Sequence, residues 1–436
     1  MPSKLELFLL RDEEGPIVFA PLRKQAARIN EAAVGAVGRR LYGKEAMDGD
    51  EAVIRPLEEI GFFEPAEVQF AGQGNPAHVT LFPTDGCNLR CRYCYAGAEK
   101  PRHVLPVSAG KAAVRYAADN AVKQGRDCFE IDFHGNGEPM TAFPVVKEVT
   151  EYAHQLADSI GLRVWISITT NGVMREDKLD WLMAYVDDVT LSFDGLEELQ
   201  NFQRPMADGS ASYPAADRTL RRLNDSGKPF AIRTTLTAAG IDKLIPLALH
   251  VANRYPACEL LHIEPAWETG RSLQSGEHSP DAELFLRYFL QAEKLLTGRM
   301  RLVFSADRPW HIDNVACSAP RDNFTVTAEG LVTACYEVCE TADPRADRFI
   351  YGRYDKEKDC FIIDEAKRAA LSLLTVEHMP HCADCFCKYS CCGDCAAKLL
   401  GLKDPSAHAG SERCIITRGL TLAHIAKLLN EEAAQL

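Results

Sequence analysis

The chain has 436 residues, a length that corresponds as a first expectation to two or three domains. Apolar residues make up 46% and charged residues 25% of the sequence, proportions typical of a water-soluble globular protein with ample core. The 62 acidic residues outnumber the 49 basic ones, and the net charge of −13 argues against a general nucleic-acid or anionic-membrane binder.

Targeting signals and cysteine usage point to the cytoplasm. No apolar run approaches the length of a membrane span, and Glu6 interrupts the short apolar stretch that a signal peptide would need. Disulfides are not expected in that compartment, so the 16 cysteines need another explanation. Metal ligation by thiolates is the better interpretation, because three cysteines lie within 87–94 and eleven between 317 and 414.

The N-terminal segment predicts two short strands and two helices. The strands cover 5–10 and 16–21 around a turn signal, the first helix is capped by Asn30, and the second covers about 50–60. This order resembles a small winged-helix unit. A Gly/Pro-rich link at 71–76 follows it, so we expect a first domain at 1–75.

The middle of the chain alternates between strand-like and helical segments, which predicts an α/β domain of parallel strands with crossover helices. Six such units favour a partial TIM-like (β/α)6 barrel over a complete barrel of eight. We expect this barrel at 76–300 and a cysteine-rich region of hairpins and loops at 301–436, ending in a helix near 411–433. The predicted strands are 78–82, 128–133, 163–171, 189–193, 230–236 and 260–265, and the predicted helices are 109–124, 142–159, 214–226 and 240–253.

A C-x3-C-x2-C motif directly follows the first barrel strand. Its thiolates, Cys87, Cys91 and Cys94, can hold three irons of a four-iron cubane and leave the fourth iron open. The carboxyl end of a barrel strand is where ligands collect. With Tyr93 before the last cysteine, the motif resembles that of the radical S-adenosylmethionine (SAM) enzymes. A fragment of a zinc site is the alternative.

Further motifs at strand ends resemble SAM-binding positions of this family. Gly135-Asn136-Gly137-Glu138 departs from the commoner Gly-Gly-Glu form, so the atoms that contact the methionyl ammonium stay open. Arg204 falls where relatives place an arginine near the methionyl carboxylate, with a surface salt bridge as the alternative. The remaining positions that the resemblance implies are Thr170 and Asn171 after the third strand, and Ser192 and Asp194 near the ribose.

The resemblance also implies a reaction. The methionyl group of SAM chelates the open iron, and the reduced cluster cleaves SAM to a 5′-deoxyadenosyl radical, which abstracts hydrogen from carbon. The cofactor carries this chemistry, and the protein supplies chelation, orientation and exclusion of water.

The C-terminal cysteines resemble the seven-cysteine SPASM extension of radical enzymes that modify peptides and proteins. One four-thiolate zinc knuckle is the alternative for the central group. The resemblance implies two auxiliary [4Fe-4S] clusters, hence three clusters in all. The nearer auxiliary cluster would take Cys317, Cys335 and Cys395, and the farther one Cys382, Cys385, Cys391 and Cys414.

The nearer auxiliary cluster lacks an obvious fourth ligand. His311 and Cys339 are candidates, and an open position is the third possibility. If 331–339 were one continuous strand, Cys335 and Cys339 would lie roughly 13 Å apart, too far for one cubane unless the strand turns. Such clusters favour a net oxidation, because a nearby cluster can accept the electron that a substrate radical must lose.

The N-terminal unit resembles leader-peptide recognition elements, which capture an extended peptide by adding a strand to a sheet edge. A plain packing extension is the alternative. We therefore expect a maturase that forms a carbon–carbon, thioether or ether crosslink in a ribosomally made precursor peptide, with flavodoxin or ferredoxin as electron donor. The rivals are an anaerobic sulfatase maturase that makes formylglycine and a non-enzymatic zinc scaffold. Candidate proton acceptors are Glu337, Tyr336 and Glu264.

Overall fold

The computed structural model describes residues 4–70, 74–99, 101–399 and 410–433, so part of the predicted link at 71–76 lies outside the described residues. The chain divides into two compact units, one of Met1–Gly72, Ser305–Cys317 and Leu374–Leu436, and one of Gln73–Phe304 and Ser318–Leu373. We call the first the terminal unit and the second the barrel unit. The division of the sequence into three domains at 75 and 300 stays a prediction.

The barrel unit is organised by one sheet of eleven strands in the order β10-β9-β8-β7-β6-β5-β4-β11-β12-β13-β14. Pairing is parallel from β10 through β4 to β11, and antiparallel from β11 to β14. The strands are β4 (His78–Leu81), β5 (Cys128–Phe133), β6 (Arg163–Thr170), β7 (Asp188–Ser192), β8 (Phe230–Leu236), β9 (Leu260–Pro265), β10 (Arg301–Val303), β11 (Thr325–Val326), β12 (Leu331–Thr333), β13 (Ile350–Asp355) and β14 (Cys360–Ile363).

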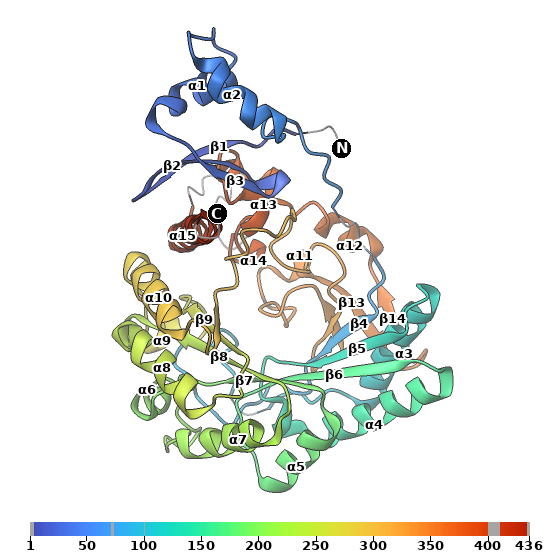
Figure 1. Ribbon diagram of the computed structural model, residues 1–436. Helices are drawn as coiled ribbons and strands as arrows, with labels where there is room; N and C mark the ends of the chain where they lie inside the picture. The colour runs from blue at the N-terminus through green and yellow to red at the C-terminus, as the bar shows by residue number, and fades with distance from the viewer. Residues whose placement is uncertain (1–3, 71–73, 100, 400–409, 434–436) are drawn as a thin grey trace. The chain divides into compact units, whose positions relative to one another are not determined.

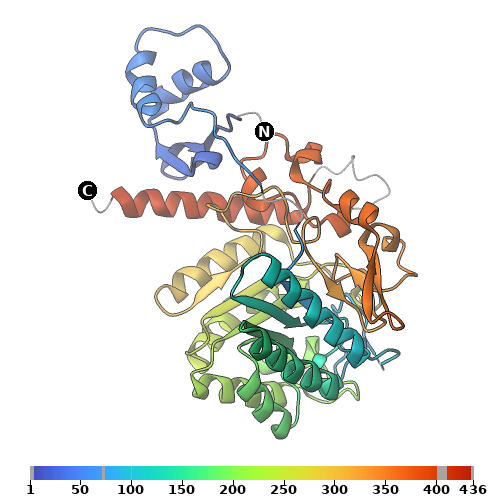
Figure 2. The same cartoon turned by 90° about the vertical axis from the view of Figure 1, so that its right-hand side faces the viewer.

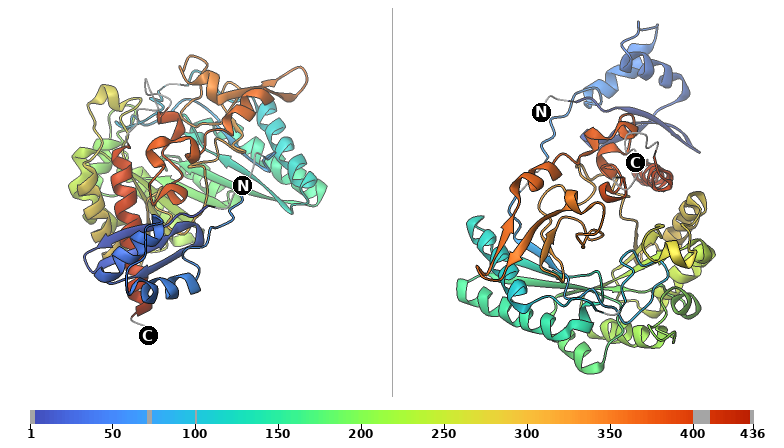
Figure 3. Two further views of the ribbon diagram at one scale, coloured as in Figure 1. Left: turned by 90° about the horizontal axis from the view of Figure 1, so that it is seen from above. Right: turned by 180° about the vertical axis from the view of Figure 1, so that it is seen from behind.

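Helices cover the outer face of this curved sheet, as Figure 1 and the view from behind in Figure 3 show for α3, α4, α5 and α7. The α-helices of the unit are α3 (Val107–Lys123), α4 (Phe143–Ile160), α5 (Glu176–Tyr185), α6 (Glu197–Gln203), α7 (Tyr213–Ser226), α8 (Leu244–Arg254), α9 (Ser272–Ser275), α10 (Ala282–Leu296), α11 (Ala346–Phe349) and α12 (Glu365–Leu371); short 3-10 turns lie at η2 (Pro139–Ala142) and η3 (Ala238–Lys243).

The two faces of the sheet differ in polarity, which follows from the alternation of side chains along each strand. On β5, Phe129, Ile131 and Phe133 are fully buried. The alternate side chains lie on the inner face, where Asp132 stands opposite Ser167 of β6 and accepts a hydrogen bond of 3.0 Å from its hydroxyl. The inner face is therefore polar, and functional groups gather toward the carboxyl ends of the strands.

The predicted barrel strands are all present, with ends that differ by at most one residue. The prediction of six strand-helix units missed β10, which runs parallel to β9 and is preceded by α10. Three residues are too few to show strand alternation, which explains the omission. The fold is mixed α/β with a large parallel sheet, consistent with a partial barrel.

The terminal unit contains a three-stranded antiparallel sheet with helices on both faces. Ala36, Val37 and Ile54 of α1 and α2 pack on one face, and Ile425 of α15 packs with Ile17 and Phe19 on the other. Figure 2 shows α15 as one long helix. The elements are β1 (Phe8–Asp12), β2 (Gly15–Ala20), η1 (Pro21–Arg23), β3 (Gln25–Arg28), α1 (Glu31–Leu41), α2 (Asp50–Glu59), η4 (Val376–His378), η5 (Pro380–Cys382), α13 (Lys388–Cys391), α14 (Ala396–Leu399) and α15 (Glu412–Ala433).

Sequence reasoning found two of the three strands here. The side chain of Asn30 caps α1 as predicted, accepting a hydrogen bond of 2.9 Å from the Ala33 N–H. The strand β3 was missed because Gln25-Ala26-Ala27-Arg28 has no strand-forming composition and pairs only through its backbone with β2. The winged-helix interpretation stays a prediction. Among the helices described, none has the length and apolar character needed to cross a membrane.

Candidate active site

Three cysteines lie together in the loop that follows β4. Cys91 is buried, while Cys87 and Cys94 are half-buried. Burial raises the pKa of the Cys91 thiol to about 12, and the charges of Cys94 and Cys87 add to this rise. Burial, and then the charge of Glu138, raise the pKa of Cys87 to about 11. The three cysteines share one eight-residue stretch of this loop, and three thiols are the donor set that fits three corners of a [4Fe-4S] cluster.

Glycines allow the cysteine loop to pack directly on the loop after β5. A Cβ atom on Gly137 would lie 2.2 Å from the carbonyl oxygen of Gly86, a distance that no side chain tolerates. The next residue, Glu138, donates its N–H to that same oxygen at 2.8 Å. Gly135 accepts a hydrogen bond of 3.1 Å from the hydroxyl of Tyr95, and Asn136 lines a small cavity. The backbones of the cysteine loop and of the loop after β5 are thus in direct contact.

The Glu138 carboxylate is buried and joins the ends of two strands. It accepts hydrogen bonds from the Thr170 hydroxyl (2.7 Å), the Asn171 N–H (2.7 Å) and the Met140 N–H (3.0 Å). Burial raises its pKa, and these three donors oppose the rise. Since a carboxylate accepts about four hydrogen bonds, about one position remains for a ligand ammonium.

Asn171 connects the end of β6 to the cysteine loop. Its side-chain N–H2 donates to Asn88 Oδ1 at 2.8 Å and reaches the sulfur of Cys87 at 3.8 Å. The amide of Asn88 donates in turn to the carbonyl oxygen of Val173 at 2.9 Å. The structure therefore brings the predicted positions Thr170 and Asn171 against Glu138 and Cys87.

Tyr93, Asp194 and Arg204 form a buried network. The Tyr93 hydroxyl donates to Asp194 Oδ2 at 2.7 Å and accepts from Arg204 Nη1 at 2.7 Å. Burial raises the pKa of the Asp194 carboxyl, while Arg204 and the donors Tyr93 and Gln203 oppose the rise. Arg204 is 7% exposed, which excludes the surface salt bridge considered for it. Ser192 is half-buried on β7, and its predicted ribose contact stays a prediction.

Within the part of the chain that the structure describes, the buried Nε of Arg204 has no hydrogen-bond partner. A buried cationic N–H without an acceptor is costly, so this atom favours an anionic ligand next to the cysteine loop. With the three thiols and the free acceptor position of Glu138, the site fits an amino-acid group such as the methionyl end of SAM.

A segment that sequence reasoning missed holds the cysteine loop from another side. Arg271 donates its backbone N–H to Cys94 O (2.9 Å) and its guanidinium to Cys91 O (2.9 Å) and Ala98 O (2.6 Å). A Cβ on Gly270 would lie 2.2 Å from the carbonyl oxygen of Tyr95. We call residues 270–275 the brace. Its contacts are to backbone carbonyls, so no motif in the sequence announces them.

The three predicted proton acceptors all belong to the barrel unit. Tyr336 places its hydroxyl 2.9 Å from Thr80 Oγ1 of β4 and its ring centroid 4.9 Å from that of His134. Glu337 lies 3.5 Å from the Arg345 guanidinium. Glu264 at the end of β9 lies 2.7 Å from Nε2 of His262, a partner that sequence reasoning missed. The proton-acceptor role stays a prediction for each.

The continuous strand considered for 331–339 does not form. β12 ends at Thr333, and the Val338 N–H donates to Cys335 O at 3.1 Å, which closes a turn. Burial, followed by the charge of Cys335, raises the pKa of Cys339. The separation of roughly 13 Å derived for an extended strand therefore does not apply, because the chain turns between Cys335 and Cys339.

The other predicted ligands are divided between the units. Cys335 and Cys339 belong to the barrel unit, and Cys317, Cys395 and His311 to the terminal unit. Within the terminal unit, burial raises the pKa of Cys382 and Cys391 to about 12, and the charge of Cys414 contributes to both. Cys385 also acts on Cys382. The four predicted ligands of the farther cluster, Cys382, Cys385, Cys391 and Cys414, thus gather in one unit.

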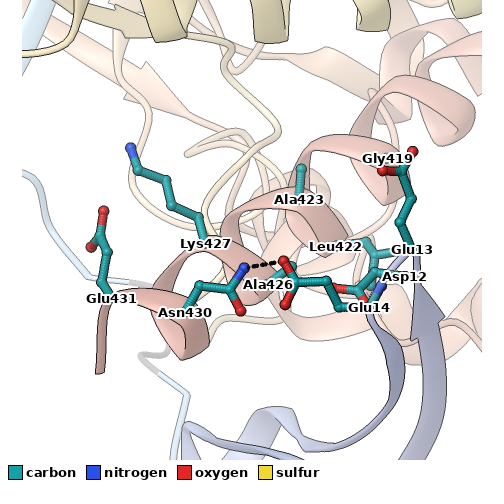
Figure 4. A pocket seen from close by; sticks show the side chains of 10 residues that line it. All are labelled: Asp12, Glu13, Glu14, Gly419, Leu422, Ala423, Ala426, Lys427, Asn430 and Glu431. Atoms are coloured by element: carbon teal, nitrogen blue, oxygen red, sulfur yellow. Dashed lines mark hydrogen bonds between the residues drawn. The ribbon is translucent and has the colours of Figure 1, made fainter. Parts of the chain in front are cut away.

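The terminal unit also contains a cavity of about 700 Å³, shown in Figure 4. The turn between β1 and β2 contributes Asp12, Glu13 and Glu14, and α15 contributes an apolar floor that includes Leu422 and Ala426. The Asn430 side chain donates to Glu14 at 2.7 Å across one end. The cavity therefore joins an apolar surface to an acidic rim.

The comparisons with known proteins agree with the barrel site. Residues 81–243 match the family model of the radical SAM superfamily. An uncharacterized protein of Methanocaldococcus jannaschii is 29% identical over 163 residues, which span 37% of this chain and 53% of that protein. A serine-type anaerobic sulfatase-maturating enzyme of Klebsiella aerogenes is 24% identical over 350 residues, covering 74% of this chain and 80% of its own length.

Two solved structures have a similar fold. Native anSMEcpe with bound AdoMet and Cp18Cys peptide matches with a TM-score of 0.64 at 16% identity, over 81% of this chain and 99% of that one. Streptococcus suis SuiB bound to precursor peptide SuiA matches with a TM-score of 0.57 at 14% identity, over 94% of this chain and 99% of that one. The family match favours an iron–sulfur cluster over the zinc alternative, and the role of Cys87, Cys91 and Cys94 as its ligands stays a prediction.

Proposed function

We propose that this radical SAM enzyme, whose family domain covers residues 81–243, forms an oxidative crosslink in a ribosomally made peptide. The observation that carries the proposal is the combination, in one chain, of the three-cysteine loop with the three-stranded sheet of the terminal unit, whose edge strands β1 and β3 pair only with β2 among the described residues. SuiB, which shares the fold over 94% of this chain, was solved with a precursor peptide bound.

The barrel site would hold the cofactors that the family implies. Cys87, Cys91 and Cys94 would ligate one [4Fe-4S] cluster, and Glu138 with Arg204 would hold the methionyl ammonium and carboxylate of SAM. When bound, the two groups supply a radical that abstracts hydrogen from carbon. The chain fixes these side chains before any ligand arrives, since each of them is anchored by neighbouring loops.

Two auxiliary clusters complete the proposal and would supply an electron acceptor for a net oxidation. The farther one would use Cys382, Cys385, Cys391 and Cys414, which all belong to the terminal unit. The nearer one would use Cys317, Cys335 and Cys395. We favour Cys339 over His311 as its fourth ligand, because the turn after β12 places Cys339 beside Cys335.

The terminal sheet offers two edges for strand addition, since β1 and β3 each pair only with β2 within the described ranges. The two-residue turn Glu13-Glu14 makes Asp12 and Gly15 a hydrogen-bonded pair, so Arg11 of β1 directs its N–H outward. Ala27 stands opposite Val18, and by the same alternation Ala26 of β3 directs its N–H outward. An extended peptide can pair with either row of groups.

Proline substitutions test each edge separately, because proline removes the outward N–H without breaking the ladder to β2. Arg11→Pro and Ala26→Pro are compared with Arg11→Ala and Ala26→Ser, which keep the N–H. The probe is the peptide encoded in a short reading frame beside this gene, and binding is measured by fluorescence anisotropy. One proline variant should lose binding at least tenfold, whereas unchanged binding in both would refute strand addition.

The acidic rim of the cavity favours a leader segment that carries basic side chains. Glu13 and Glu431 face the cavity, and only Lys427 among its lining residues is basic. Binding of such a peptide should weaken with added salt, since screening acts on exposed charges. A salt-independent affinity would show that the rim takes no part.

Co-expression with the neighbouring peptide tests the product. A crosslink removes two hydrogen atoms per bond, and fragmentation locates the linked residues by mass spectrometry. An unmodified peptide, recovered with enzyme that cleaves SAM, would contradict the peptide-crosslinking assignment.

A formylglycine-forming activity is the second candidate, and the sequence match to the Klebsiella sulfatase-maturating enzyme favours it. Its product is an aldehyde, which a hydrazide reagent labels. A crosslinked peptide contains no aldehyde and is not labelled. Flavodoxin or ferredoxin as electron donor and a cytoplasmic location belong to either version of the proposal.

A further inference from the structure

A short backbone ladder pairs the cysteine loop with the segment after α6. Leu89 and Met206 form an antiparallel bridge. The Arg90 N–H donates to Pro205 O and the Arg92 N–H to Gln203 O, each at 2.8 Å. By this register, Cys91 stands directly opposite Arg204. Side chains that oppose each other in such a ladder have Cβ atoms about 4.5–5.5 Å apart.

Arg204 is fixed in this position. It follows the last turn of α6, where its N–H donates to Gln200 O at 2.8 Å, and its guanidinium donates to the Tyr93 hydroxyl at 2.7 Å. That hydroxyl donates in turn to Asp194, which is fully buried. The guanidinium is thus a permanent positive charge held out of water beside a cysteine sulfur.

A buried charge acts strongly on its neighbours because little water screens it. Reduction of an iron–sulfur cluster adds one negative charge, and cluster potentials respond to nearby charge and to solvent exposure. Asp194 opposes Arg204, but the ladder places Arg204 opposite Cys91, whereas Asp194 reaches the loop through Tyr93. The positive charge therefore dominates at the sulfur.

We propose that Arg204 raises the reduction potential of the cluster held by Cys87, Cys91 and Cys94. This is a positioning role that acts through the Cys91 sulfur, separate from a contact with the SAM carboxylate. It rests on the proposed function only in taking these three cysteines as cluster ligands. The electron comes from an external one-electron reductant, and no bond in the protein forms or breaks.

The test is a potential titration of the full-length, anaerobically reconstituted protein without SAM, so that a lost carboxylate contact cannot contribute. The reductant is dithionite with mediators. The EPR signal absent from a Cys94→Ala variant identifies this cluster among the others. Arg204→Met is compared with Arg92→Met, because Arg92 carries the same charge and lies on the cysteine loop itself, but its side chain is partly exposed and pairs with Glu277.

Arg204→Met should shift the midpoint negative by at least a tenfold change in the reduction equilibrium, ~59 mV for one electron. Arg92→Met should leave it unchanged. The double variant Arg204→Met with Asp194→Asn should have a midpoint potential between those of the parent and Arg204→Met, since it also removes the opposing negative charge. Equal midpoints for Arg204→Met and the parent protein, at equal iron and sulfide content, would overturn the inference.

Arg204→Lys keeps the proposal testable if Arg204→Met fails to assemble a cluster. The lysine retains the charge, so its midpoint should stay near that of the parent, while Arg204→Gln should shift negative. A shift of the same size in both variants would show that shape rather than charge matters. Failure of the parent protein itself to assemble the cluster would count against the proposed function instead.

Discussion

At the scale of single residues, the Glu138 carboxylate joins the loop after β5 to the end of β6. Its three hydrogen-bond donors come from its own loop and from the end of β6. A glutamine in its place has only one acceptor oxygen, and its N–H2 group would face one of these hydrogen-bond donors. The site therefore depends on Glu138 for its shape as well as for any contact with a ligand.

Glu138→Gln should lower the free energy of unfolding by about 1–3 kcal/mol, because buried donors lose their acceptor. Anaerobic denaturant unfolding of cluster-free protein measures this change. Glu130→Gln, at an exposed position of β5, the strand that precedes the Glu138 loop, is the control and should cost less than about 0.5 kcal/mol. A Glu138→Gln protein as stable as its parent would show that these bonds carry little energy.

His134 should make stability depend on pH. Burial lowers its pKa below the usual value near 6.5, so the unfolded chain binds a proton more readily than the folded one. The folded state with a neutral His134 therefore keeps its full stability above about pH 6.5 and loses stability as the pH falls below that value.

As the pH is lowered from about 7 to about 5, the midpoint temperature of thermal unfolding should therefore fall more steeply for the parent than for His134→Gln. His278→Gln replaces an exposed histidine and should reproduce the slope of the parent. Identical slopes for all three proteins would contradict the assignment to His134.

Residue types with a motif were predictable at this scale, and residues without one were not. Cys87, Glu138 and Asn171 belong to patterns at strand ends, and the structure brings them together. Arg271 acts on backbone carbonyls and His262 on a side chain two residues away, so neither stands out in the sequence. The charge environment of Arg204 also required the fold, since it depends on a ladder that sets Arg204 opposite Cys91, 113 positions earlier in the chain.

At the scale of elements, the brace fixes the cysteine loop before any iron is bound. Its hydrogen bonds reach Cys91, Arg92, Cys94 and Ala98. A loop held in this way presents its sulfurs in place, which lowers the cost of assembling a metal site.

Gly270→Ala should release iron faster, because the added Cβ cannot fit against the Tyr95 carbonyl and must displace the loop. Release to a chelator, followed by visible absorbance, should accelerate at least several-fold. Gly276→Ala is a matched control: its φ is also positive (+70°, against +56° for Gly270), but no atom lies within 4 Å of its Cβ. Equal release rates in the two variants would attribute the effect to backbone strain alone.

Element prediction succeeded where hydrophobic alternation is long and failed where it is short. The strands β4 to β9 have four to eight residues each and bury alternate apolar side chains against helices. β3 and β10 have four and three residues, and tertiary pairing rather than local sequence decides their conformation. The turn after Thr333 was not predicted for a similar reason, because it depends on the hydrogen bond that the Val338 N–H donates to Cys335 O rather than on a pattern in the sequence.

At the scale of the whole molecule, the chain passes between the two units at 72, 304, 317 and 373. The segments that carry the predicted auxiliary ligands are therefore shared between the units, while the residues proposed to bind SAM belong to the barrel unit alone. Sequence order does not reveal this exchange, because residues 305–317 and 374–436 join the N-terminal segment only in the folded state.

The division predicts that the two kinds of cluster site fail independently. Cys382→Ala with Cys385→Ala should preserve formation of 5′-deoxyadenosine and abolish the modified peptide, because the barrel site is untouched. Liquid chromatography with mass spectrometry measures both products. Cys360→Ala, at an exposed cysteine outside the predicted sets, should retain both; an unchanged yield of modified peptide in the double variant would refute an essential auxiliary role.

The most direct measurement of the central claim is SAM cleavage by the anaerobically reconstituted protein under dithionite. The account predicts 5′-deoxyadenosine from the parent protein and none from a variant with alanine at Cys87, Cys91 and Cys94. A parent protein with full iron and sulfide loading that never cleaves SAM would contradict it.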